Sequence, residues 1–112
     1  MKKILMIVAP ENFRDEELFE PKKALEDRGF EIEIASKRVQ EALGARGGKI
    51  KVDQDLAGAR VELYQAVIFV GGSGSSVYFN DPDALFLAKK AYEKGKTVAA
   101  ICIAPSILAN AG

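Results

Sequence analysis

Hydrophobic and polar positions along the chain form short segments that alternate between the periods of strands and helices. Residues 3–9 (KILMIVA) are a continuous hydrophobic run, typical of a parallel strand that is buried on both faces. Residues 30–36 (FEIEIAS) alternate hydrophobic and polar positions and predict a second strand. Residues 66–70 (AVIFV) and 96–101 (KTVAAI) predict two further buried strands.

The segments between these strands predict helices. The first helix begins at the acidic residues 15–17, which suit the positive end of a helix dipole, and ends at Gly29. The second begins at Asp81-Pro82, an N-cap followed by proline at the first helical position, and ends at Gly95. The expected hydrophobic stripes are Leu18, Pro21, Ala24 and Leu25 on the first helix, and Ala84, Leu85, Ala88, Ala91 and Tyr92 on the second. Residues 104–111 predict the start of a third helix.

Strands that alternate with helices indicate parallel strands joined by right-handed crossovers. We therefore expect an α/β fold over residues 1–112, a doubly wound, mostly parallel sheet with helices on both faces. The three glycines within residues 44–48 predict a turn, followed by a short edge strand at residues 49–53. Ligand sites in such folds lie at the carboxyl ends of the strands, where residues 10–16, residues 71–76 and Cys102 are expected.

Composition restricts the classes of function. With 112 residues the chain is one small domain, and its 16 basic and 16 acidic residues give no electrostatic reason to expect nucleic acid or an anionic membrane as a partner. The hydrophobic runs are too short to span a bilayer, and the first residues lack the apolar core and cleavage site of a signal peptide. A single cysteine cannot form an internal disulfide, which fits a reducing cytoplasm.

The chain contains no histidine, which excludes several kinds of site. A Ser-His-Asp or Cys-His catalytic unit cannot be built from this chain alone. One cysteine and no histidine leave only carboxylates as further zinc ligands, which disfavours a zinc site. We expect neither a metal nor a cofactor.

Cys102 stands between a predicted buried strand and a predicted helix, the position of a nucleophile elbow. The start of a helix favours an anion and thereby increases the thiolate fraction of a cysteine there. The backbone N–H of Ile103, together with that of Gly72, would stabilise an oxyanion. The alternative from position alone is that Cys102 is a small, inert core residue.

Three motifs resemble the ThiJ/PfpI superfamily, a group with a class I glutamine amidotransferase-like fold. They are KILMIVAPENFRDEELFEP, IFVGGSG and AAICIAPSILANAG, which occur in the family's order and approximate spacing along essentially the whole chain. The family includes intracellular proteases, glyoxalase- and deglycase-like enzymes and stress chaperones. The resemblance implies a flavodoxin-like fold and a reactive Cys102.

The resemblance also implies a role for Glu17, which lies four residues before Pro21, as the family's glutamate does. In its protonated form Glu17 would donate a hydrogen bond to the Cys102 thiolate or to an oxidised sulfinate. Its neighbours Asp15 and Glu16 are expected to be solvated charges of the first helical turn. Protease members have a histidine directly after the cysteine and an acidic residue after the Gly-Gly pair, where this chain has Ile103 and Ser76.

Family members continue well beyond the closing Ala-Gly, so we expect the chain to be the N-terminal portion of a ThiJ/PfpI-type domain, as a fragment or one chain of a cleaved protein. The preferred function is a cysteine-dependent hydrolase or lyase acting on a carbonyl or acyl substrate, either a small molecule or a peptide. The alternative is a non-enzymatic redox sensor or chaperone with an oxidisable Cys102. Whether the chain is an enzyme stays open here. The resemblance further implies a homo-oligomer, or association with a separate C-terminal fragment that supplies the absent histidine.

Overall fold

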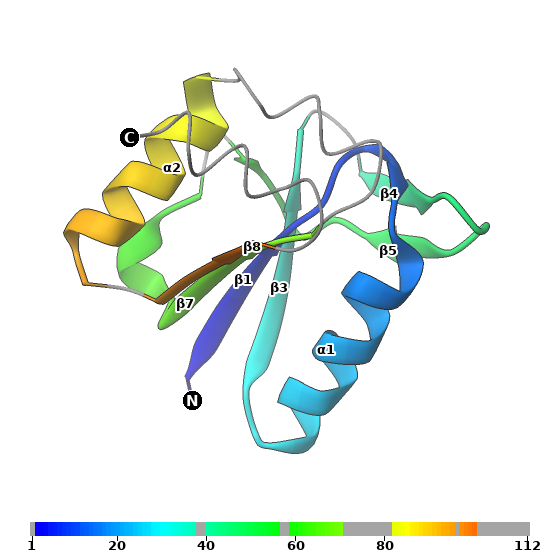
Figure 1. Ribbon diagram of the computed structural model, residues 1–112, viewed down its shortest axis with the longest axis horizontal. Coiled ribbons are helices and arrows are strands. Elements are labelled where there is room, and N and C mark those ends of the chain that lie inside the picture. Colours follow the sequence, from blue (N-terminus) through cyan, green and yellow to red (C-terminus); the bar gives the residue numbers. More distant parts are fainter. Residues whose placement is uncertain (1, 38–39, 57–58, 71–81, 96, 101–112) are drawn as a thin grey trace.

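The computed structural model describes residues 2–37, 40–56, 59–70, 82–95 and 97–100. Its centre is a five-stranded parallel sheet in the order β6-β3-β1-β7-β8 (Figure 1). The strands are β1 (Lys3–Ile7), β3 (Glu31–Ser36), β6 (Gln54–Asp55), β7 (Ala66–Phe69) and β8 (Thr97–Ala100). The four predicted strands are therefore confirmed, and the order β3-β1-β7-β8 is that of the flavodoxin-like doubly wound fold.

One described helix lies on each face of this sheet, α1 (Asp15–Asp27) on one side and α2 (Pro82–Glu93) on the other (Figure 1). The continuous hydrophobic run of β1 explains this arrangement, because its alternate side chains enter two separate cores. Ile4, Met6 and Val8 belong to the core that contains Leu18 of α1. Leu5, Ile7 and Ala9 belong to the core that contains Ala84, Leu87, Ala88 and Ala91 of α2.

The helix boundaries agree with the turn residues in the sequence. Gly29 and Gly95 have φ values of +92° and +73°, which only glycine adopts readily, and each directly follows the last turn of its helix. The predicted stripes are wrong at two positions: Ala24 is exposed on α1, and Tyr92 of α2 is 78% exposed. Leu87, outside the predicted stripe, is buried instead, because α2 also packs against the 3-10 helix η2 (Val61–Leu63).

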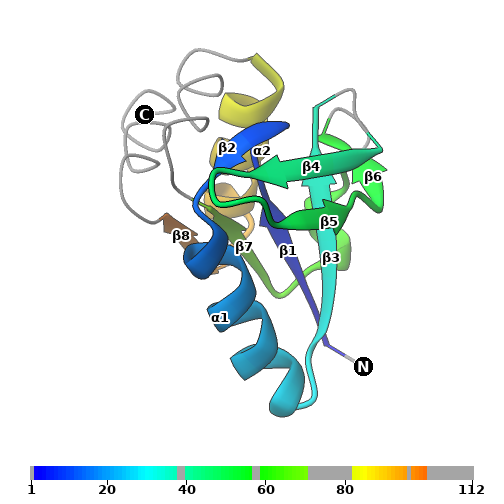
Figure 2. The same cartoon turned by 90° about the vertical axis from the view of Figure 1, so that its right-hand side faces the viewer.

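A second, three-stranded sheet lies above the carboxyl ends of the main sheet and beside the start of α1 (Figure 2). It contains β2 (Glu11–Phe13), β4 (Glu41–Gly44) and β5 (Lys49–Lys51). β4 and β5 form an antiparallel hairpin with Gly47 at φ +91° in its turn. The expected turn and edge strand are confirmed, whereas β2, β4 and β6 were not predicted.

A partly buried polar cluster joins the edge strand β6 to the rest of the sheet. The Tyr64 hydroxyl donates a hydrogen bond to Glu33 Oε1 at 2.7 Å and accepts one from the Gln54 side-chain amide. Lys3 Nζ lies 3.1 Å from the other Glu33 oxygen. Burial is the main cause that raises the pKa of Tyr64 to about 12, and the hydrogen bond to Glu33 is the second. The same hydrogen bond is the main cause that lowers the pKa of Glu33.

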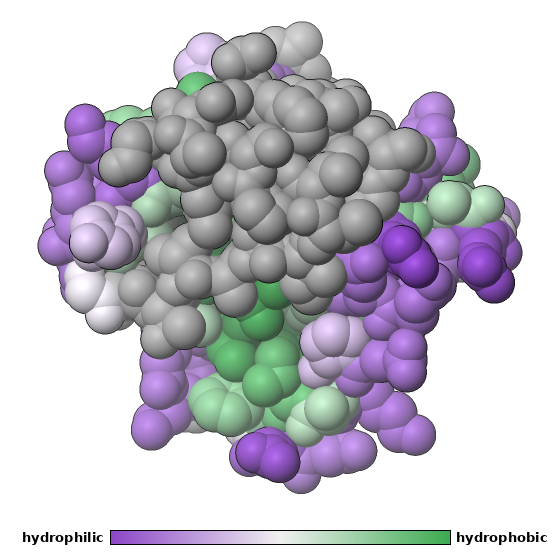
Figure 3. Space-filling view, viewed as in Figure 1, coloured by the Kyte–Doolittle hydropathy of each residue, from purple (hydrophilic) through white to green (hydrophobic). Residues whose placement is uncertain are grey.

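Among the described residues, more hydrophobic side chains are only partly buried on the α1 side of the sheet than on the α2 side. Figure 3 shows a hydrophobic area on this side of the molecule, bordered by hydrophilic surface. The hydrophobic residues that pack against the α1-side core without being fully buried are Phe19, Leu25, Phe30, Ile32, Ile50, Ala66 and Ile68. Within the described part of the chain, α1, β2 and the hairpin are the helices and strands outside the main sheet that contribute side chains to this core.

Candidate functional site at the carboxyl edge of the sheet

Three neighbouring strands end at the same level of the sheet. Ile7, the last residue of β1, pairs with Phe69 of β7, and Phe69 pairs in turn with Ala100 of β8. The ends of these three strands therefore lie side by side. In the sequence they precede, in chain order, Glu17, Gly72 and Cys102, which is the basis for expecting a shared site at this edge.

The structure places one of the four predicted site residues, Glu17. Gly72, Cys102 and Ile103 lie outside the described residues. The structure does describe the strand that precedes each of these residues. In the sequence, Gly72 comes three residues after the end of β7, and Cys102 comes two residues after the end of β8.

Glu17 lies in the first turn of α1, which the preceding segment sets in position. Asn12 adopts a φ of +59°, a left-handed conformation that asparagine tolerates, and Phe13 then enters the α1-side core. Arg14 is the N-cap residue, and its carbonyl accepts hydrogen bonds from the backbone N–H groups of Glu17 at 3.0 Å and Leu18 at 3.2 Å. Leu18 is fully buried and anchors this turn on the sheet.

The two carboxylate oxygens of Glu17 have different surroundings. Oε2 lies 3.4 Å from the Nε atom of Arg14, and the side chain as a whole is 16% exposed. Oε1 is buried and has no hydrogen-bond partner among the residues that the structure describes. Buried polar atoms are nearly always hydrogen-bonded, so an oxygen in this position requires a donor from elsewhere.

Neither neighbour of Glu17 is a simple solvated charge: Glu16 is partly exposed and accepts a hydrogen bond from Arg14 Nε at 3.0 Å, and Asp15 is tied to another segment. The carboxylate of Asp15 accepts two backbone hydrogen bonds from the β4–β5 turn, from Arg46 N–H at 2.9 Å and from Gly48 N–H at 2.8 Å. The hydrogen bond from the Arg46 N–H is the main cause that lowers the pKa of Asp15. The interpretation of Asp15 as a solvated charge was therefore wrong: it ties the first turn of α1, and with it Glu17, to the hairpin.

The glycines of the hairpin are shaped to this carboxylate. A Cβ atom at Gly44 would lie 2.5 Å from Asp15 Cγ, and one at Gly48 would meet both Asp15 Oδ2 and Phe19 Cε2. Neither glycine has a positive φ, so the requirement is one of space rather than backbone conformation. The glycines are the sequence signal of a close approach to another segment, but they do not indicate which segment that is.

Within the described residues no group of three or more potential metal ligands occurs, and no helix is both long and apolar enough to cross a membrane. Among the described residues, the Glu17 carboxylate has an arginine at one oxygen and no hydrogen-bond partner at the other.

Comparison with known proteins decides the family. The family model described as "DJ-1/PfpI family" matches residues 2–112. The chain belongs to the DJ-1/PfpI family. The resemblance to ThiJ/PfpI proteins drawn from the three motifs is thereby confirmed.

Relatives in this family differ in what is known of them. An uncharacterized protein of Methanocaldococcus jannaschii is 41% identical over 98% of this chain and 54% of its own length. A deglycase of Pyrococcus horikoshii and the deglycase PfpI of Pyrococcus furiosus are each 34% identical over 98% of this chain and 66% of their own length. The chain thus spans between about half and two thirds of the length of these relatives.

Solved structures confirm the fold. A ThiJ/PfpI domain protein from Brachyspira murdochii superimposes with a TM-score of 0.94 at 35% identity, over 97% of this chain and 63% of the other. An oxidized DJ-1 of Toxoplasma gondii superimposes with a TM-score of 0.88 at 25% identity, over 100% of this chain and 62% of the other.

Proposed function

We propose that the chain contributes Cys102 and Glu17 to a thiol-dependent site that acts on a carbonyl or acyl carbon. The substrate class is a small reactive aldehyde, a glycated side chain or a peptide, with deglycation favoured because relatives at 34% identity are named deglycases. A reducing compartment such as the cytoplasm would keep the single thiol active. The observation that carries the proposal is the buried, unpartnered Oε1 atom of Glu17 at the carboxyl edge of the sheet.

The register of the strands supports Cys102 as the partner of this oxygen. Two Cα–Cα steps separate Cys102 from Ala100, a distance of at most about 7.6 Å, so the thiol cannot lie far from the strand end. The end of β8 is level with the end of β1, from which the chain reaches Glu17. A sulfur that accepts a hydrogen bond from Glu17 would satisfy the otherwise unpaired carboxyl.

The proposed chemistry begins with attack of the Cys102 thiolate on the carbonyl carbon. The sulfur–carbon bond forms as the carbonyl π pair moves onto oxygen, and the N–H groups of Gly72 and Ile103 stabilise the resulting oxyanion. With an aldehyde, the oxyanion takes up a proton to give a hemithioacetal. With an acyl substrate, the oxyanion collapses, the bond to the leaving group breaks, and water then hydrolyses the thioester. This chain has no histidine, so Glu17, solvent or a histidine of an associated segment supplies the protons.

A second candidate function uses the same two residues without turnover. Two equivalents of peroxide convert a cysteine thiolate to a sulfinate and release two molecules of water. A protonated Glu17 would donate a hydrogen bond to that sulfinate. The structure of Toxoplasma gondii DJ-1 is described as oxidized, which supports oxidation as a second candidate function. Selective addition of two oxygens at Cys102, measured by intact mass after mild peroxide treatment and lost in Glu17→Leu, would support the redox role.

The deciding experiment measures the rate of iodoacetamide labelling of Cys102 against pH. We expect a midpoint below the ordinary thiol value of about 8.5, a higher midpoint in Glu17→Leu, and partial recovery in Glu17→Gln, which keeps a hydrogen-bond donor. Glu20→Gln, on an exposed side chain of the same helix, is the matched control and should leave the midpoint unchanged.

Turnover of methylglyoxal, glycated amino acids and model peptides then separates the enzyme from the sensor. Activity that is lost in Cys102→Ser supports the enzyme. An ordinary midpoint that Glu17→Leu does not move, with no turnover that depends on Cys102, would overturn the proposal.

A further inference from the structure

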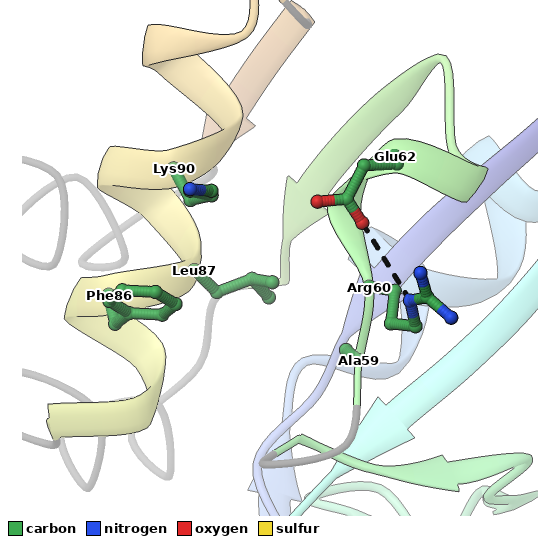
Figure 4. Close-up of a pocket in the computed structure, with 6 residues that line it drawn as sticks. All are labelled: Ala59, Arg60, Glu62, Phe86, Leu87 and Lys90. Atoms are coloured by element: carbon green, nitrogen blue, oxygen red, sulfur yellow. Dashed lines mark ion pairs between the residues drawn. The ribbon is translucent and has the colours of Figure 1, made fainter.

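The contact between Arg14 and Glu17 differs from an ordinary surface ion pair. Such an ordinary pair is that of Arg60 and Glu62 on the wall of a groove beside α2, where Nε and a carboxylate oxygen are 3.9 Å apart and both side chains are well exposed (Figure 4). Exposed pairs of this kind contribute little to stability. The Glu17 side chain is only 16% exposed, so the approach of Arg14 Nε to its Oε2 atom at 3.4 Å is less screened by solvent.

The Arg14 side chain is also held by Glu16. Its Nε–H donates a hydrogen bond to Glu16 Oε1 at 3.0 Å, so Glu16 fixes the guanidinium while Glu17 lies beside its charge. The backbone N–H of Glu16 and then this hydrogen bond lower the pKa of Glu16, which is therefore ionised at neutral pH. The Arg14 side chain makes no capping hydrogen bond, because it is the backbone carbonyl of Arg14 that caps α1. The side chain can therefore be replaced without removing the cap.

The guanidinium makes the two oxygens of Glu17 unequal. Arginine carries a positive charge and hydrogen-bond donors only, so a proton on Oε2 would face a like charge. A proton on Oε1 would lie on the far side of the carboxyl, where this buried atom has no partner among the described residues. Electrostatics therefore favour Oε1 as the protonated oxygen. For the same reason a glutamine at position 17 would turn its carbonyl oxygen toward Arg14 and its NH₂ group toward the buried position.

We propose that Arg14 is a positioning residue of the thiol site: its guanidinium keeps Oε2 of Glu17 as an acceptor and thereby makes the buried Oε1 the donor toward Cys102. This inference rests on the proposed function, because it takes the Cys102 sulfur as the acceptor. Glu16 assists by holding the guanidinium in place and by offsetting its charge. A carboxyl with two chemically equivalent oxygens would in this way present one donor in a defined direction.

The Glu17→Gln variant makes this direction measurable, because an amide does not titrate and its donor and acceptor ends are distinct. We expect Glu17→Gln to retain part of the lowered midpoint of Cys102 labelling while Arg14 is present, and to lose it when Arg14→Met is added. Removal of a positive charge by itself raises the pKa of a nearby thiol. The double variant Glu17→Leu, Arg14→Met measures that contribution alone, since leucine has no donor to orient.

The expected difference between the two backgrounds is the scale of one hydrogen bond. Arg14→Met should raise the labelling midpoint by about 0.5–1 pH unit more in Glu17→Gln than in Glu17→Leu. Arg14→Lys keeps the charge and should restore much of this difference. Lys23→Met, which removes an exposed cation of the same helix, is the matched control and should act equally in both backgrounds. Circular dichroism verifies that each variant is folded.

The outcomes separate this inference from the proposed function on which it rests. If Glu17→Leu raises the midpoint but Arg14→Met acts equally in the Gln and Leu backgrounds, Arg14 does not orient Glu17, and the thiol site stands without it. If Glu17→Leu leaves the midpoint at its wild-type value, Glu17 does not act on Cys102, and both proposals are wrong. A larger shift in the Gln background that Arg14→Lys reverses supports Arg14 as the positioning residue.

Discussion

Replacing Gly44 with alanine tests whether Asp15 holds the hairpin against α1. The new Cβ atom would lie 2.5 Å from Asp15 Cγ and 2.6 Å from Oδ1, well inside van der Waals contact. Asp15 cannot move aside freely, because its oxygens accept the backbone hydrogen bonds of Arg46 and Gly48. Overpacking of this kind costs about 1–3 kcal/mol, whereas the lower entropy of the unfolded alanine chain contributes only about 0.4–1 kcal/mol in the opposite direction.

The sign of the effect should therefore depend on Asp15. In the wild-type background we expect Gly44→Ala to lower the free energy of unfolding by about 1–2 kcal/mol, the difference between these two terms. In an Asp15→Ala background all three of the closest contacts are absent, so the same substitution should become neutral or slightly stabilising. Urea unfolding followed by circular dichroism measures both values.

Gly47→Ala provides the matched control in the same turn. Gly47 has a φ of +91° and no atom within 4 Å of an added Cβ, so its substitution is unfavourable for backbone reasons alone, by about 1–2 kcal/mol. That cost should be the same in both backgrounds. If Gly44→Ala were equally destabilising with and without Asp15, the proposed contact between the carboxylate and the hairpin would be wrong.

Three further predictions concern the core and its titrating groups. Tyr64→Phe should lower stability by about 1–3 kcal/mol through loss of the hydroxyl between Glu33 and Gln54. Because the pKa of Tyr64 is raised from 10.0 to about 12, its contribution should be complete below pH 10 and lost as pH rises to about 12, a loss absent from the variant in urea titrations. The lowered pKa of Asp15 predicts a contribution present above about pH 3.8 and lost on further acidification, so Asp15→Asn should flatten acid unfolding followed by circular dichroism. Leu18→Ala should cost about 2–5 kcal/mol in thermal or urea unfolding, and equal stability would show that this turn is not anchored.

Much of the main sheet could be predicted from the sequence because its signals are local. A continuous hydrophobic run such as residues 3–9 indicates burial on both faces, and glycines such as Gly29 and Gly95 mark the ends of helices through their own backbone conformation. The hairpin was harder to predict, since β4 presents Ala42 to the core and leaves Leu43 41% exposed. Its place is set by contacts with residues that are distant in sequence.

Local and long-range contacts also explain why Glu17 could be predicted from the sequence and the role of Asp15 could not. Glu17 was predicted from its place in a family motif, and Asp15 was set aside because nothing near it in the sequence indicates a partner. Its hydrogen-bond donors, Arg46 and Gly48, follow it by 31 and 33 residues. A pattern read along one segment cannot reveal a contact whose other half lies in a turn of uncertain pairing.

The contact of Asp15 with the hairpin has a consequence for Glu17, because both residues belong to the same helical turn. A carboxylate with one buried, unsatisfied oxygen is costly, and it persists only where the surrounding structure prevents its rotation toward water. Three restraints act on this turn: the burial of Leu18, the Arg14 carbonyl that accepts its first N–H groups, and the hairpin N–H groups on Asp15. Releasing Asp15 should therefore let Glu17 turn outward, so that Asp15→Ala reproduces part of the Glu17→Leu effect on Cys102 labelling without altering either site residue.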